Sequence, residues 1–278
     1  MIDGVVVVDK DGGWTSHDVV AKLRGRFKQK RIGHSGTLDP DATGVLLIGL
    51  GRATRLLKYL TDLPKTYTGE VVFGVATSTL DAGGDVTGEW DMSLTLADVE
   101  AAAATLTGSI LQVPPMVSAL KVGGKRLHEL ARAGIEVERA ARPVTVHRFE
   151  VGATPDPQVY AAEVECSSGT YIRTLAADLG AALGGGAHLR NLRRTAIGSF
   201  TLADARALDA VDDSAVLTPA EALRDYPSVE VDAAALVLVG HGRPVPDLPD
   251  GTVGVRDADG RLVAVYEDGK PSVVLAPA

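Results

Sequence analysis

The sequence has almost no cysteine and no long apolar run. Cys166 is the only cysteine in 278 residues, which excludes an internal disulfide and a thiolate cluster for a metal. No stretch of about 18 apolar residues is present, so no transmembrane helix is expected. The first residues, MIDGVVVVDK, carry acids where a signal peptide has basic residues. We therefore expect a cytoplasmic protein.

Familiar cofactor and metal motifs are missing as well. The segment SGTLDPDATG lacks the Gly-Lys-Ser/Thr ending that places a lysine on phosphate. No GxGxxG follows a strand, and the six histidines are scattered without HExxH or cysteine partners. Asp39 and Asp41 lie too close in one turn to flank a sugar as the two acids of a glycosidase do. The sequence predicts no metal and no organic cofactor.

The charge is negative overall but unevenly distributed. A net charge of -8 argues against a nucleic-acid partner. Residues 1–65 nevertheless hold 11 basic and 7 acidic residues, residues 120–150 hold 7 and 4, and residues 207–278 hold 5 and 13. If the basic stretches converge in space, they form a positive face that suits RNA. Charges on a solvated surface fluctuate in the same way, so charge leaves both interpretations open.

Strand and helix patterns follow one another irregularly. Strands are expected over residues 4–9, 45–50, 67–76, 144–153, 159–166 and 189–200. Helices are expected from an N-cap at Ser16 to Phe27, and over residues 52–60, 95–108, 127–133 and 170–183. Residues 31–44 are rich in turn formers and are expected to form an ordered loop. This order is not a regular βαβ alternation, so it predicts an α+β fold.

The composition changes near residue 209, where the chain becomes acidic and richer in proline. Several short strand-like runs follow residue 228. We therefore expect two domains, a larger one over residues 1–225 and a small β-rich one over residues 226–278.

Asp39 is the acid that stands out, because it lies in a glycine-flanked loop, HSGTLDPDATG. Gly36 and Gly44 allow the backbone to approach a ligand, and Pro40 restricts the chain after the acid. Most Asp-Pro pairs, however, only initiate turns. The residues alone do not choose between a turn and a catalytic carboxylate.

Six segments of the chain resemble the TruB family of pseudouridine synthases, in the order and spacing of that family. They are GVVVVDK with TSHDVV (4–20), GHSGTLDPDATGVLLIGLGRATR (33–55), KTYTGEVVFG (65–74), VPPMVSALKVGGKRLHELARAGIEVERAARPVTV (113–146), CSSGTYIRTLAADLG (166–180) and GAHLRNLRRTAIGSF (186–200). Each is weak alone, but the set is specific. The resemblance implies a pseudouridine synthase fold: a mixed, mostly antiparallel sheet with flanking helices, and a reduced PUA-like C-terminal domain.

The resemblance also implies roles for individual residues. It makes Asp39 the catalytic carboxylate, which acts without a cofactor. Arg173 matches an arginine that orients and ionises the aspartate, and Tyr67 matches a tyrosine that stacks on uracil and could move a proton. Four further residues match positions that support the site or contact the substrate: Lys10, His34, Tyr171 and Leu192. Taken without the resemblance, each is explained by a surface or core position.

Residues 118–142 match a basic, thumb-like insertion that closes on RNA, and Lys121, Lys125 and Arg126 are its expected RNA contacts. A charge run is otherwise a solvated face. The chain departs from the family at Asp11, where proline is usual, and at Val117, where tyrosine is usual. The acidity of the C-terminal domain puts an RNA role for it in doubt.

The resemblance predicts conversion of uridine-55 in the T loop of tRNA to pseudouridine, a reaction for which the base must leave the stack to reach a buried acid. The expected partner is the T stem-loop of tRNA, with no membrane and no obligate protein partner, and the protein is expected to be a monomer. Two alternatives remain: a tRNA-binding or tRNA-folding protein with secondary catalysis, and a synthase for another RNA.

Overall fold

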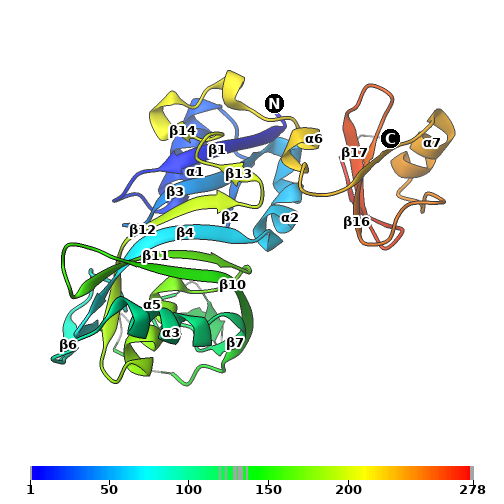
Figure 1. The fold of residues 1–278 in the computed structure, drawn as a ribbon. Coiled ribbons are helices and arrows are strands. Elements are labelled where there is room, and N and C mark those ends of the chain that lie inside the picture. The colour runs from blue at the N-terminus through cyan, green and yellow to red at the C-terminus, as the bar shows by residue number, and fades with distance from the viewer. Residues whose placement is uncertain are drawn as a thin grey trace. The chain divides into compact units, whose positions relative to one another are not determined.

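The computed structural model describes residues 2–118, 120–122, 124–127, 130, 134–135 and 137–275 (Figure 1). The chain divides into two compact units. Unit 1 is Met1–Leu63 with Ala196–Ala278, and unit 2 is Pro64–Thr195. None of the helices in the described residues is long and apolar enough to span a membrane.

A small apolar sheet lies at the centre of unit 1. Strand β1 (Gly4–Lys10) pairs antiparallel with β3 (Thr43–Leu50), which also pairs antiparallel with β2 (Ile32–Ser35). Strand β14 (Arg206–Ala207) joins β1 in parallel. The valines of β1 and nearly all of β3 are buried, as their continuous apolar runs predict. Strand β2 lies inside the segment expected to be a loop, so that expectation was wrong for residues 32–35.

Helix α1 (Ser16–Arg26) begins one residue earlier than expected, because Ser16 is its first residue and not its N-cap. Thr15 is the N-cap, and its hydroxyl and the Asp18 carboxylate form a capping box. Ser16 is instead fully buried and bonds Leu38, whose N–H donates to the Ser16 hydroxyl at 2.9 Å. The second expected helix is a 3₁₀ helix, η1 (Gly51–Leu56), continued by α2 (Leu57–Asp62). The remaining short helices of this part are η2 (Leu208–Ala210), η3 (Asp213–Ala215) and α6 (Pro219–Ala222).

The C-terminal part of unit 1 is a four-stranded sheet. Its order is β15 (Ser228–Glu230), β16 (Thr252–Arg256), β17 (Leu262–Glu267) and β18 (Lys270–Val274). Helix α7 (Ala233–Gly240) precedes β16. The sequence did not predict α7, because LVLV is typical of a strand, but Asp232 caps the helix by accepting from the Ala235 N–H at 2.8 Å.

This C-terminal sheet packs on the rest of unit 1. Leu262, Val265 and Val273 belong to the same buried cluster as Val5 and Leu60. The domain boundary at residue 225 stays a prediction, since the sheet shares a core with the residues before it.

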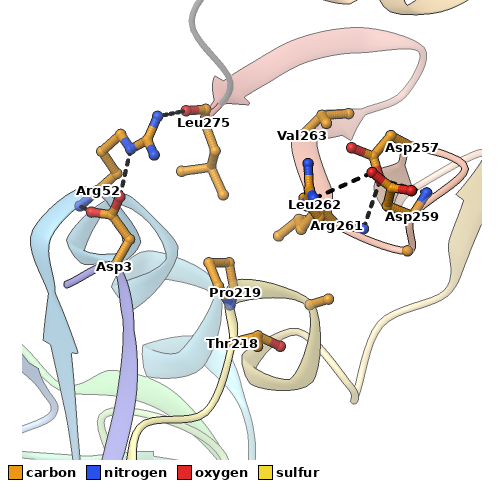
Figure 2. Close-up of a pocket in the computed structure, with 12 residues that line it drawn as sticks. Asp3, Arg52, Thr218, Pro219, Asp257, Asp259, Arg261, Leu262, Val263 and Leu275 are labelled. Atoms are coloured by element: carbon orange, nitrogen blue, oxygen red, sulfur yellow. Dashed lines mark hydrogen bonds and ion pairs between the residues drawn. The ribbon is translucent and has the colours of Figure 1, made fainter. Parts of the chain in front are cut away.

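Three cations of η1 and α2 also contact this sheet. The Arg52 guanidinium donates to the carbonyl of Leu275, Arg55 donates to that of Val274, and Lys58 pairs with Glu267 at 2.8 Å. Arg52 and Arg55 are three residues apart, so their side chains align along the 3₁₀ helix η1, and Lys58 follows three residues later in α2. Figure 2 shows the Arg52 contacts, including its ion pair with Asp3.

Five paired strands form the framework of unit 2. The strand order is β12 (Ala187–Ile197), β4 (Lys65–Phe73), β11 (Val159–Cys166), β10 (Arg142–Ala153) and β7 (Gly108–Gln112). Strands β4, β11, β10 and β7 pair antiparallel. The expected strand over 189–200 is a hairpin, in which the end of β12 pairs with β13 (Phe200–Thr201).

Helices α3 (Leu96–Thr105) and α5 (Ile172–Ala182) contribute to the buried cluster of unit 2. Thr95 and Asp98 form the predicted capping box of α3. Two small hairpins complete the unit: β5 (Val75–Thr77) with β6 (Val86–Glu89), and β8 (Lys121–Val122) with β9 (Lys125–Arg126). The helix expected over 127–133 falls largely outside the described residues.

Two of the three glycines between α5 and β12 make room for large side chains. A Cβ on Gly185 would lie 2.4 Å from the Met92 sulfur, and one on Gly186 would lie 2.3 Å from Cζ3 of Trp90. A Cβ on Gly88 would likewise lie 2.4 Å from Cη2 of the Trp90 ring. The indole is therefore in contact with two glycines, which sets the path of the chain into β12.

We predict that Gly186→Ala lowers the free energy of unfolding by about 1 kcal/mol or more, because the new methyl must displace the indole. Denaturation followed by Trp90 fluorescence, in a Trp14→Phe background, measures this. Gly152→Ala is the control, since its Cβ meets nothing within 4 Å and should change stability by less than about 0.5 kcal/mol. Equal stability of the two variants would contradict the packing.

Candidate active site

Lys10 is a fully buried cation that organises one loop of unit 1. Its ammonium donates to the carbonyls of Asp11 at 3.0 Å, Trp14 at 2.7 Å and Pro40 at 2.9 Å. An ammonium has three donors, and a buried one is stable only when they are satisfied. The Pro40 carbonyl also accepts from the Gly13 N–H at 3.0 Å. Lys10 therefore ties the end of β1 to the chain directly after Asp39.

Asp39 lies between two anchored neighbours. Leu38, which precedes it, is 3% exposed and bonds the buried Ser16 through both its N–H and its carbonyl. Pro40, which follows it, is held by Lys10. Asp39 itself is half-buried, and its carbonyl accepts from the Ala42 N–H at 3.2 Å. The loop is thus anchored on both sides of Asp39.

His34 lies on β2, on the strand that leads into this loop. Its ring is half-buried and meets the exposed ring of His17 edge to face, with centroids 5.3 Å apart. Unit 1 therefore contains three of the predicted site residues, and Lys10 contacts the Asp39 loop directly.

Tyr67 and Leu192 lie in unit 2 on adjacent strands of its sheet. Tyr67 is on β4, Leu192 is on β12, and both are half-buried against the same apolar cluster. A Cβ added at Gly69 would lie 3.4 Å from the Arg190 carbonyl oxygen, which is ordinary van der Waals contact between the two strands. A half-buried tyrosine beside a half-buried leucine could stack on a flat base.

Arg173 is buried near the start of α5 and joins two other segments of unit 2. One of its nitrogens donates to the Thr79 carbonyl at 2.9 Å and to the Asp81 carboxylate at 3.2 Å. The other donates to the Val117 carbonyl at 3.0 Å. Tyr171, two residues earlier, is the N-cap residue of α5. Unit 2 therefore brings Tyr171 and Arg173 together at one helix end.

Asp81 was not among the predicted site residues. It accepts from the Thr79 hydroxyl at 2.6 Å and from the Gly83 N–H at 3.1 Å, so its carboxylate shapes the turn that it shares with Arg173. The sequence offered only the turn signal DAGG, which is typical of any loop. Its pairing with a residue 92 positions away became visible only in the structure.

Of the basic insertion that is expected to contact RNA, the structure describes part of the backbone. Lys121 pairs with Arg126, and Val122 with Lys125, between β8 and β9. The side chains of the three predicted RNA contacts lie outside the described residues.

The cavity, the cysteine and the acidic residues elsewhere in the described part of the chain do not suggest a different active site. A cavity of about 600 Å³ in unit 1 is lined by Asp3 and Arg52 and by the turn around Asp259, and it includes none of the predicted site residues (Figure 2). Burial raises the pKa of the Cys166 thiol to about 11, so that thiol is neutral at physiological pH. Within the described part of the chain, no three His, Cys, Asp or Glu residues are grouped to hold a metal.

Comparison with known proteins accounts for nearly the whole chain. Residues 24–172 match the model of the TruB family pseudouridylate synthase N-terminal domain. Residues 173–227 match that of the tRNA pseudouridylate synthase B C-terminal domain, and residues 226–274 match that of the tRNA pseudouridine synthase II C-terminal domain.

Curated relatives and a solved structure are similar to this chain over nearly its whole length. The tRNA pseudouridine synthase B of Nocardia farcinica is 50% identical over 277 residues, covering 96% of this chain and 90% of its own. That of Mycobacteroides abscessus is 48% identical over 274 residues, covering 95% and 92%. A chain in the crystal structure of a Cbf5–Nop10–Gar1 complex is 25% identical with a TM-score of 0.74, covering 99% of this chain and 84% of its own.

These matches confirm the predicted α+β fold with a pseudouridine synthase core and a small C-terminal β part. Because the family models follow one another without a gap and full-length relatives are about half identical, the chain belongs to the TruB family of pseudouridylate synthases.

Proposed function

We propose that this enzyme isomerises uridine-55 in the T loop of tRNA to pseudouridine, with Asp39 as the catalytic carboxylate. The observation that carries the proposal is the rigid placement of Asp39, between Leu38 and Pro40, which are anchored by Ser16 and Lys10. A carboxylate that must meet one atom of an extruded nucleotide benefits from such a fixed backbone. The tRNA substrate is supported by relatives that carry the name tRNA pseudouridine synthase B.

The reaction breaks the N1–C1′ bond, turns the base and forms a C5–C1′ bond, and the C5 proton is replaced by one on N1. It conserves all atoms of the nucleoside and needs no redox partner. Asp39 would add to the base or remove the C2′ proton, and both routes require an ionised carboxylate. Tyr67 and Leu192 would bind the base, while Arg173 and Tyr171 would act beside it from the start of α5. Pairing of Arg173 with Asp39 remains a prediction. One chain would suffice as a monomer, without a protein partner.

We expect Asp39→Asn to abolish detectable turnover, because it keeps the shape of the side chain and removes its charge. The affinity for tRNA should change by less than about tenfold, or about 1.4 kcal/mol. Pseudouridine mapping on an unmodified tRNA transcript, together with a filter-binding assay, measures both quantities. Asp41→Asn, an exposed acid of the same loop, is the control and should keep its activity. Appreciable turnover by Asp39→Asn would refute the assignment.

We expect Asp81→Asn to slow the chemical step by about 10- to 100-fold, because the Arg173 guanidinium loses the carboxylate that orients it. The Thr79 and Val117 carbonyls would still hold it, so the loss should be smaller than for Asp39→Asn. Single-turnover rates measure this. Asp85→Asn in the same hairpin is the control, because the bonds of Asp85 to Ser78 use its backbone N–H and carbonyl and not its carboxylate. An unchanged rate for Asp81→Asn would remove Asp81 from the site.

The third expectation concerns RNA affinity, which we assign to the basic insertion and not to the acidic C-terminal sheet. Deleting the sheet is a poor test, because Leu262 and Val265 are part of the core of unit 1. Two triple variants to glutamine compare the regions without exposing that core. One changes Lys121, Lys125 and Arg126, and the other changes Arg243, Arg261 and Lys270, which are exposed.

The insertion variant should bind tRNA more weakly and with a shallower salt dependence, by about one unit of slope for each phosphate that it no longer neutralises. The C-terminal variant should bind nearly as the wild type does. The tRNA dissociation constants of the two variants, measured across a series of salt concentrations, show which region supplies the affinity. A larger fall in affinity for the C-terminal variant would make its sheet the main RNA anchor.

A further inference from the structure

Gln112 is a buried amide that bonds one peptide unit far away in the chain. It is the last residue of β7 and only 2% exposed. Its side-chain oxygen accepts from the Tyr171 N–H at 2.8 Å, and its side-chain nitrogen donates to the Tyr171 carbonyl at 3.1 Å. The two bonds reproduce the exchange that a neighbouring strand would make with that residue. A single side chain thereby holds both polar groups of the Tyr171 backbone.

The bonded residue is the N-cap of α5, and this helix lacks a side-chain cap of its own. The Tyr171 carbonyl also accepts from the Leu175 N–H at 3.1 Å, which begins the helix. A carbonyl has two lone pairs and can accept both bonds. Gln112 therefore stabilises the start of α5 from outside, where a Ser, Thr or Asp cap would otherwise do so.

The same segment makes a second contact with the start of α5. Five residues after Gln112, the Val117 carbonyl accepts from the Arg173 guanidinium at 3.0 Å. Residues 112–117 thus form hydrogen bonds with the backbone of Tyr171 and the side chain of Arg173. They lead directly into the basic insertion. Because the contact at residue 117 is a backbone carbonyl, valine can make it as well as the tyrosine that is usual there.

We propose that Gln112 is a positioning residue for pseudouridine formation, which sets the direction of Tyr171 and Arg173 through the Tyr171 peptide. The proposal rests on the proposed function, since it assigns these two residues to the reaction. Glutamine suits the role because its amide offers an acceptor and a donor side by side. Ionised glutamate offers only acceptors and would face the Tyr171 carbonyl with a negative oxygen. Methionine fills the same space and offers no comparable donor or acceptor.

Three variants test this role. Gln112→Met removes both bonds and Gln112→Glu removes the donor, while both keep the approximate volume. Gln158→Met is the matched control, because Gln158 is also in unit 2 and donates a side-chain bond to the Met92 carbonyl at 2.8 Å, away from α5. Single-turnover rates on an unmodified tRNA transcript, tRNA dissociation constants and unfolding temperatures are measured for each folded protein.

We expect both Gln112 variants to lose at least about tenfold in single-turnover rate, because small displacements of a catalytic group are costly. Their tRNA dissociation constants should stay within about threefold of wild type, and Gln158→Met should keep its rate within about twofold. Such a split between rate and affinity does not follow from general loss of stability. If Gln112→Met fails to fold, Gln112→Glu carries the test.

Unchanged rates in the Gln112 variants would overturn the positioning role while leaving the proposed function intact. Equal losses in rate and affinity, or failure of both Gln112 variants to fold while Gln158→Met folds, would reduce Gln112 to a purely structural residue. Absence of pseudouridine with the wild-type enzyme would instead refute the proposed function.

Discussion

The buried guanidinium of Arg173 is the interaction on which the arrangement of unit 2 depends. It connects α5 to the turn between β5 and β6 through Thr79 and Asp81, and to the start of the insertion through Val117. Arginine can do this because its planar fork presents several donors at fixed angles and stays charged at any physiological pH. Loss of these bonds would leave two carbonyls and a carboxylate to be satisfied separately. Segments far apart in the sequence therefore share one buried cation.

In unit 1 a buried cation also connects separate segments of the chain, but the cation is a lysine. Lys10 is fully buried, and three backbone carbonyls accept from its ammonium. Carbonyl partners do not titrate, so the attachment of the Asp39 loop does not depend on the protonation state of these partners. A lysine is sufficient here because the carbonyls surround a point charge, whereas the partners of Arg173 lie along a fork. In both units a buried cation, and not an apolar contact, determines where the chain runs next to a predicted catalytic residue.

Much of the fold followed from local sequence, and the errors have local causes. The valine runs of β1 and β3 predicted buried strands, and Thr95 with Asp98 predicted the start of α3, since both signals depend on neighbouring residues alone. Ser16 was misassigned because Thr15 and Ser16 are equally good caps, and only the bond of Ser16 to Leu38 separates them. The loop aspartate was predicted through family motifs, whereas Asp81 and Gln112 bond residues 92 and 59 positions away. No local pattern encodes such a partner, so these two residues could be found only from the fold.

The distribution of charge shows why counts along the sequence overstate an RNA-binding surface. Several cations of the basic N-terminal stretch are bonded within the protein: Lys10, Lys22, Arg24, Arg26, Arg31, Arg52, Arg55 and Lys58. Arg52, Arg55 and Lys58 hold the acidic C-terminal sheet, and Arg148 is paired with Glu150 and Glu163. A cation that already donates to the protein has fewer donors left for a phosphate, and breaking an ion pair to meet one reduces its net gain from RNA. The positive charge of the first 65 residues therefore serves largely to hold the chain together, and two of these cations pair with acids after residue 207, Lys22 with Asp209 and Lys58 with Glu267.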